Sequence, residues 1–154
     1  MKLFFAGIFA VVALVVGAVA LLPKQNNPIA GDPNIVSMAG LHWHPQLEIY
    51  VKGETIDIPQ NIGIGAEYHG KPGYGAGNMA MTPIHTHEDL PIIHLEFQGV
   101  VRKDDITLGK FFDVWSKDMR SFGANMRMTV NGVENTEYAD YIMRDGDQIE
   151  LRYD

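Results

Sequence analysis

Five of the six histidines lie in short motifs whose spacing suits a metal ion; they are His42, His44, His85, His87 and His94. The first four form two His-x-His pairs. Successive side chains of an extended chain point to opposite faces, so both imidazoles of a pair lie on one face. Imidazole nitrogens are common ligands of copper and zinc. The spacing therefore predicts a metal site assembled from three segments, with these five histidines as ligands.

The strand predicted after the second pair alternates in polarity. Its apolar side chains in segment 93–97 would point to the core, whereas His94 and Glu96 would share the opposite, polar face. A carboxylate beside a metal-binding imidazole can accept a hydrogen bond from the second ring N–H and so fix the tautomer. The candidates for this role, or for direct ligation, are Glu88, Asp89 and Glu96.

The identity of the metal is constrained by the ligand types that the chain offers. There is no cysteine, so a site must use imidazole, carboxylate or thioether groups. Met79 and Met81 precede His85 and are candidate soft ligands. We expect copper, which imidazoles and thioethers bind outside the cytoplasm, and zinc is the alternative.

The first 22 residues predict the compartment. Residues 3–22 form an uncharged apolar run that is followed by Pro23-Lys24. About twenty such residues match a bilayer core of roughly 30 Å. We expect a retained single-pass transmembrane anchor with its N-terminus in the cytoplasm and the rest outside the cell. A cleaved signal peptide is the competing interpretation, with Ala18-Val19-Ala20 as the cleavage tripeptide.

The remaining chain has the length of one domain. Residues 23–40 are rich in Pro, Asn and Gly and read as a linker, which leaves 41–154 as an extracytoplasmic β-rich domain. The formal net charge is −7, and every acidic residue lies after the apolar run. This charge disfavours nucleic acids and anionic lipid surfaces as partners and favours cations.

The polarity pattern predicts an α+β domain with a mostly antiparallel sheet. Residues 47–58 alternate as a hairpin, and 63–77 contain six glycines and read as a long irregular loop. Asn131-Gly132 indicates a second hairpin. The order of strand, helix, strand, turn and strand from 92 to 154 suggests a β-grasp-like sheet crossed by one helix, with the 47–58 hairpin as an addition. One apolar stripe predicts that helix; it consists of Leu108, Phe111, Phe112, Trp115 and Met119.

The domain resembles a widespread family of uncharacterised exported or membrane-anchored bacterial and archaeal proteins. Their motifs are His-x-His, Ile-Pro-x-x-Ile-Gly-Ile, His-Thr-His-Asp, Ile-His-Val-Glu and Thr-Leu-Gly-x-Phe-Phe-Asp-x-Trp. The corresponding segments here are His42-Trp43-His44, Ile58-Pro59-Gln60-Asn61-Ile62-Gly63-Ile64, His85-Thr86-His87-Glu88, Ile93-His94-Leu95-Glu96 and Thr107-Leu108-Gly109-Lys110-Phe111-Phe112-Asp113-Val114-Trp115. The chain departs from the family at Glu88-Asp89, where a single Asp is usual, and at Leu90-Pro91, where small residues are usual. The resemblance implies the architecture and the histidine set, without an activity.

Three classes of function are compatible with these features. The first is a membrane-anchored protein that binds and delivers a metal through the histidine cluster. The alternative is an accessory subunit of a larger membrane complex, in which the histidine-rich face is an interface. The third is a metal-dependent enzyme with an open coordination position and a carboxylate base. The chain contains no nucleophile motif, phosphate-binding loop or dinucleotide fingerprint, which disfavours the third class.

Overall fold

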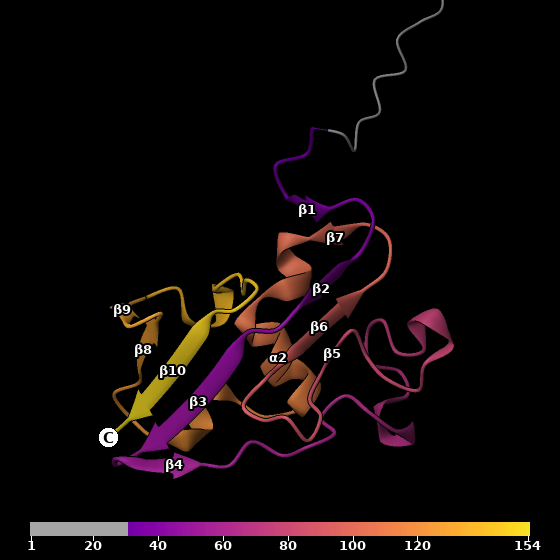
Figure 1. Cartoon of the computed structure of the whole chain (residues 1–154). Coiled ribbons are helices and arrows are strands. Elements are labelled where there is room, and N and C mark those ends of the chain that lie inside the picture. Colours follow the sequence, from indigo (N-terminus) through magenta and orange to yellow (C-terminus); the bar gives the residue numbers. More distant parts are fainter. Residues whose placement is uncertain (1–30) are drawn as a thin grey trace, which may run out of the picture. The chain divides into compact units, whose positions relative to one another are not determined.

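The computed structural model describes residues 31–154 (Figure 1). The predicted anchor at residues 3–22 and the beginning of the predicted linker lie outside the described residues. Within the described part, none of the helices has both the length and the apolar character needed to cross a membrane.

Residues 31–154 have mixed α+β structure with mostly sheet and a single α-helix. The strands are β1 (Ile35–Ser37), β2 (Leu41–Trp43), β3 (Gln46–Val51), β4 (Glu54–Ile56), β5 (Ile84–His85), β6 (His94–Phe97), β7 (Val101–Arg102), β8 (Arg127–Val130), β9 (Val133–Glu134) and β10 (Gln148–Tyr153). The helix is α2 (Leu108–Trp115), and the short 3₁₀ helices are η1 (Ala66–Tyr68), η2 (Ala76–Asn78), η3 (Lys103–Ile106), η4 (Met119–Phe122) and η5 (Tyr138–Asp140).

The larger sheet has the strand order β4-β3-β10-β8-β9, in which only the central pair β3 and β10 is parallel. The 47–58 hairpin is present as β3 and β4, but its prediction as an addition to the sheet is wrong. β3 is an interior strand of this sheet, between β4 and β10, whereas β6 belongs to another sheet. The parallel register places Leu47 beside Ile149, and both are buried, so the two strands contribute to one core.

The core forms where this sheet meets α2 and the smaller sheet. One face of β10 is buried, since Ile149, Leu151 and Tyr153 alternate along the strand and are each at most 2% exposed. The predicted helix is confirmed, and its stripe buries Leu108, Phe111 and Phe112. The last predicted stripe residue, Met119, is buried as well but lies beyond α2, in η4. Burial of this apolar surface is the main stabilising contribution to the fold.

Two hairpins of the larger sheet close through residues with positive φ, and the turn at Asn131-Gly132 is where the sequence predicts it. Asn131 and Gly132 have φ of 53° and 78° between β8 and β9, and Lys52 and Gly53 have φ of 52° and 86° between β3 and β4. Two consecutive positive φ values are required by the tight turn whose twist matches that of paired strands. These turns set the register of the β3–β4 hairpin and of the β8–β9 hairpin.

The smaller sheet, with the order β2-β6-β5, carries the predicted histidine segments. β2 is followed directly by β3, so the chain passes from the smaller sheet to an interior strand of the larger one (Figure 1). Segment 63–77 is irregular as predicted, with turns and two 3₁₀ helices. β1 lies within residues 23–40, which the sequence predicts as a linker, and it pairs with β7. The compact unit begins at Pro33.

The fully buried Leu151 provides a test of the core. We expect Leu151→Ala to lower the free energy of unfolding by about 2–5 kcal/mol, because it leaves a cavity in the core beside Ile49 and Met128. Val133→Ala is the matched control, since Val133 is 70% exposed in an edge strand and should change stability by less than about 0.5 kcal/mol. Denaturant unfolding of both variants measures the difference; equal effects would contradict this assignment of the core.

Candidate metal centre

The strand pairing of the smaller sheet brings the histidine segments together. His42 on β2 lies opposite Glu96 on β6, and His85 on β5 lies opposite His94 on β6. Directly opposite residues on antiparallel strands share one face of the sheet. His94 and Glu96 also share a face because they are two residues apart on β6. The middle strand therefore places His94 between the two His-x-His pairs.

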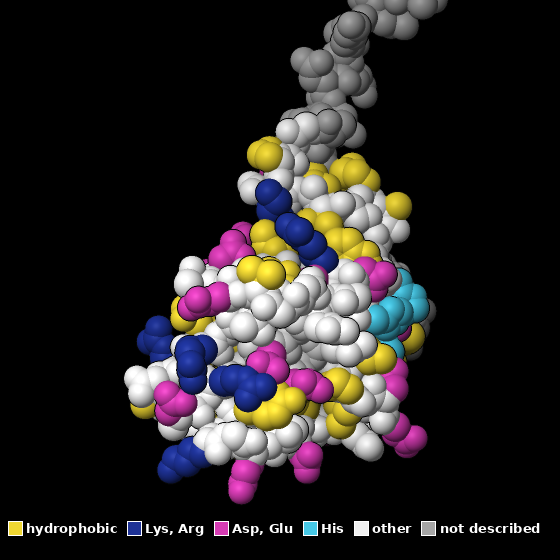
Figure 2. Space-filling model, turned by 60° about the vertical axis from the view of Figure 1, so that its left-hand side comes forward, with side chains coloured by type: hydrophobic (Ala, Val, Ile, Leu, Met, Phe, Trp, Pro, Cys, Tyr) yellow, Lys and Arg dark blue, Asp and Glu magenta, His cyan; other side chains and the backbone are white. Residues whose placement is uncertain are grey.

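All five predicted histidines form one continuous cluster of rings. The centroid distances are 4.7 Å for His42–His44, 5.0 Å for His44–His94, 4.7 Å for His87–His94, 5.4 Å for His85–His94 and 4.8 Å for His85–His87. Figure 2 shows histidine side chains gathered in one surface patch with acidic side chains beside it.

Two sets of three histidines have ligand atoms close enough for one ion. One ligand atom from each of His42, His44 and His94 lies within 4.8 Å of the others, and the same holds for His85, His87 and His94. Either set could therefore offer three imidazole nitrogens to one zinc or copper ion.

His85 is fully buried, and its tautomer is fixed by the backbone. Its Nδ1 lies 3.0 Å from the carbonyl oxygen of Thr82, which can only accept, so Nδ1 carries the proton. The lone pair is then on Nε2, which is buried and has no hydrogen-bond partner. Burial lowers the pKa of His85 below its ordinary value, and this favours the neutral form that binds metals.

His94 is fixed in the opposite tautomer by a carboxylate. Its Nε2 lies 3.1 Å from both carboxylate oxygens of Asp89, so Nε2 donates, and the hydrogen bond lowers the pKa of Asp89. The lone pair is on Nδ1, which is buried and without a hydrogen-bond partner. Asp89 thus occupies the position predicted for a carboxylate that orients a metal-binding imidazole.

His42 and His44 form the exposed part of the cluster, with 64% and 40% of their side chains exposed. Glu96 lies between this part and His94. Its Oε1 is 3.1 Å from Nε2 of His42 and 3.9 Å from Nδ1 of His94. The carboxylate of Glu96 can therefore balance the charge of a cation or bind it directly.

Several residues that hold the histidines in place were missed by the sequence analysis. Thr86, between His85 and His87, is buried; its hydroxyl donates to the Pro59 carbonyl and accepts from the Ile62 N–H. No sequence signal marks this role, because the partners lie 24 and 27 residues away.

The exposed pair is held by a residue from the other end of the chain. The backbone N–H of His44 donates to Oδ1 of Asp145 at 2.8 Å, across 101 residues. Asp145 lies in the turn that precedes β10. The same carboxylate oxygen is 3.8 Å from Nδ1 of the His44 ring.

The remaining predicted site residues lie at the margin of the cluster. Met79 is exposed, Met81 is half-buried, and both line a small recess that Glu96 also lines. Within the described part of the chain, Glu88 is exposed and makes no hydrogen bond or ion pair to the histidines. His69 contacts Tyr74 and belongs to neither histidine set.

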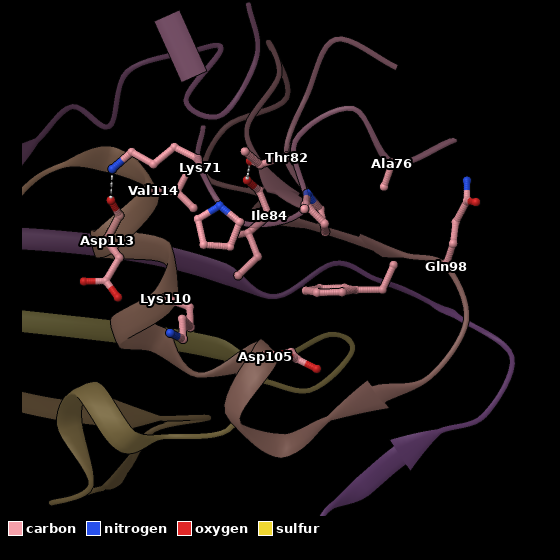
Figure 3. A pocket seen from close by; sticks show the side chains of 13 residues that line it. Lys71, Ala76, Thr82, Ile84, Gln98, Asp105, Lys110, Asp113 and Val114 are labelled. Atoms are coloured by element: carbon pink, nitrogen blue, oxygen red, sulfur yellow. Dashed lines mark hydrogen bonds between the residues drawn. The ribbon is translucent and has the colours of Figure 1, made fainter. Parts of the chain in front are cut away.

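A cavity of about 360 Å³ lies beside the segment that carries His85, and none of the five clustered histidines lines it. Figure 3 shows Thr82 and Ile84 on one side and Asp113 of α2 on the other. Lys71 spans the edge and donates to the Asp113 carbonyl at 2.7 Å. Thr82 connects the cavity with the histidine cluster, because it lines the cavity and its carbonyl accepts from His85.

No protein family, curated protein or solved structure was found to match this chain. The family resemblance therefore stays a prediction, and the α+β fold rests on the geometry of the chain itself.

The lowered pKa of His85 has a consequence for how the stability of the fold depends on pH. Below pH 6.5 the unfolded chain takes up a proton at this imidazole while the folded chain resists it, so acidification through that range favours unfolding. We expect the wild type to lose stability more steeply than His85→Asn, by at most about 1.4 kcal/mol per pH unit. Asn offers a donor for the Thr82 carbonyl but does not titrate. Equal slopes in unfolding experiments between pH 7.5 and 5.5 would contradict this account of His85.

The backbone near His85 also requires glycine at position 63. Gly63 has a φ of +80°, and a Cβ there would lie 2.6 Å from the Ile84 carbonyl oxygen and 3.1 Å from Cβ of His85. We expect Gly63→Ala to cost at least about 1–2 kcal/mol in stability through the positive φ alone. It should also displace the His85 segment and weaken metal binding. Gly53→Ala has a positive φ but no neighbour within 4 Å and is the matched control; it should lose stability without weakening metal binding.

Proposed function

We propose that this chain is a membrane-anchored, extracytoplasmic metal-binding protein that binds copper through its histidine cluster and delivers it, with zinc as the alternative ion. The observation that carries the proposal is a pair of buried imidazole nitrogens without hydrogen-bond partners, Nε2 of His85 and Nδ1 of His94. Among the described residues, these are the only buried side-chain nitrogen or oxygen atoms in that condition.

An unpartnered buried polar atom is unfavourable. Leaving one unsatisfied costs about 1–3 kcal/mol, so folded proteins contain few of them. Both atoms here carry lone pairs, because the other nitrogen of each ring donates to Thr82 or Asp89. A metal cation is a suitable partner for two such lone pairs on neighbouring strands. Metal-binding histidines typically donate a hydrogen bond from the ring N–H that does not face the metal, as His85 and His94 do here to Thr82 and Asp89.

The ligand chemistry supports copper or zinc over harder ions. Neutral imidazoles suit both metals, whereas calcium and magnesium prefer oxygen ligands. The recess lined by Met79, Met81 and Glu96 adds thioether groups near the cluster, which would favour Cu(I). The copper assignment rests on this ligand chemistry and on the extracytoplasmic location proposed for the domain.

The apolar run at residues 3–22 supports the proposed anchor, which would hold the domain at the extracytoplasmic surface of the membrane. The exposed rings of His42 and His44 would be accessible to a metal acceptor there. We also propose that the larger sheet is a β-grasp module. Its central parallel pair, its two flanking hairpins and the position of α2 between those hairpins in the chain support this assignment.

Replacing both His85 and His87 tests the proposal. We expect His85→Ala/His87→Ala to weaken binding of Cu(II) by at least roughly 100-fold in a competition titration, because two imidazole ligands are lost. The single variant His94→Ala should weaken binding more than His69→Ala, since His69 lies outside both histidine sets. Circular dichroism checks that each variant is folded. Unchanged stoichiometric binding in the double variant would refute the proposal.

A further inference from the structure

The two histidine sets share one member and differ in exposure. The outer set consists of His42, His44 and His94, and the inner set of His85, His87 and His94. The two residues unique to the outer set are exposed over 64% and 40% of their side chains. In the inner set, His85 is fully buried and His87 half-buried. The outer set is thus more exposed to solvent than the inner set.

The shared ring limits how the two sets can be filled. His94 has one nitrogen free for a metal, Nδ1, because its Nε2 donates to both oxygens of Asp89. A neutral imidazole with one protonated nitrogen binds one ion at a time. The outer and inner sets therefore compete for the same nitrogen, and a single ion bound to His94 can be completed by either pair.

We propose that the five histidines form a two-position relay for one metal ion. The ion binds first to the outer set and then moves to the inner set while His94 stays bound. This inference rests on the proposed metal-binding function and adds the order in which the ligands act. Exposure sets the direction of uptake, because the outer pair is more exposed than the inner pair, and release follows the reverse order.

The transfer is a ligand exchange without a change of oxidation state. Two imidazole lone pairs from His42 and His44 leave the ion, and two from His85 and His87 replace them. Glu96 can hold the ion between these states, because its Oε1 lies 3.1 Å from His42 Nε2 and 3.9 Å from His94 Nδ1. Its negative charge also stabilises a cation at a point with few ligands.

Stopped-flow mixing of the full-length protein, in detergent, with Cu(II) tests the relay. Trp43 lies between the two outer histidines in the chain and is a fluorescence reporter that bound Cu(II) quenches. The wild type should show a fast phase that depends on Cu(II) concentration and a slower phase that does not. The variant His42→Gln/His44→Gln should lose the fast phase and take up Cu(II) at least roughly tenfold more slowly, while still binding one Cu(II) per chain at equilibrium through the inner set.

The inner variant His85→Asn/His87→Gln should keep the fast phase, lose the slow phase and bind far more weakly. The single variant His87→Gln changes only a half-buried position and repeats the test if the double variant does not fold. His69→Gln is the control and should match the wild type.

Uptake at the wild-type rate by the outer variant would overturn the relay, as would two ions bound per chain with similar affinity. A wild type that binds no Cu(II) or Zn(II) would instead refute the proposed function itself.

Discussion

The pairing of β6 with β2 on one side and β5 on the other is the constraint on which the histidine cluster depends. Each pairing places a histidine-bearing segment next to His94 or Glu96 on the same face. A one-residue shift in the register of β6 would turn these side chains to the opposite face of the sheet and separate the histidines. The buried Ile93 and Leu95 resist such a slip, because it would expose them to water.

The surrounding structure fixes the histidines instead of leaving them as free surface rings. Thr82 and Asp89 fix two tautomers, Thr86 fastens the inner pair to residues 59–62, and Asp145 fastens the outer pair to the turn before β10. This arrangement leaves two buried lone pairs without hydrogen-bond partners, which is unfavourable. The larger sheet and its core supply the stability that offsets this cost.

Local features could be predicted from the sequence, whereas long-range partners could not. Alternation identified β3 and β6, and Asn131-Gly132 identified a hairpin, because these signals lie within a few residues. The parallel pairing of β3 with β10 was missed, since it joins segments about 100 residues apart through packing alone. The five histidines and Asp89 were foreseen from type and spacing; Thr82, Thr86 and Asp145 act through contacts that leave no local pattern.

The metal content of the full-length protein tests the central claim most directly. The protein would be purified in detergent without chelator or histidine tag, reconstituted with Cu(I), Cu(II) or Zn(II), freed of excess ion and measured by elemental analysis. The account predicts close to one tightly held copper, or one zinc, per chain. Absence of a retained transition metal under every condition would contradict it, and the histidine face would then be better explained as an interface with a larger membrane complex.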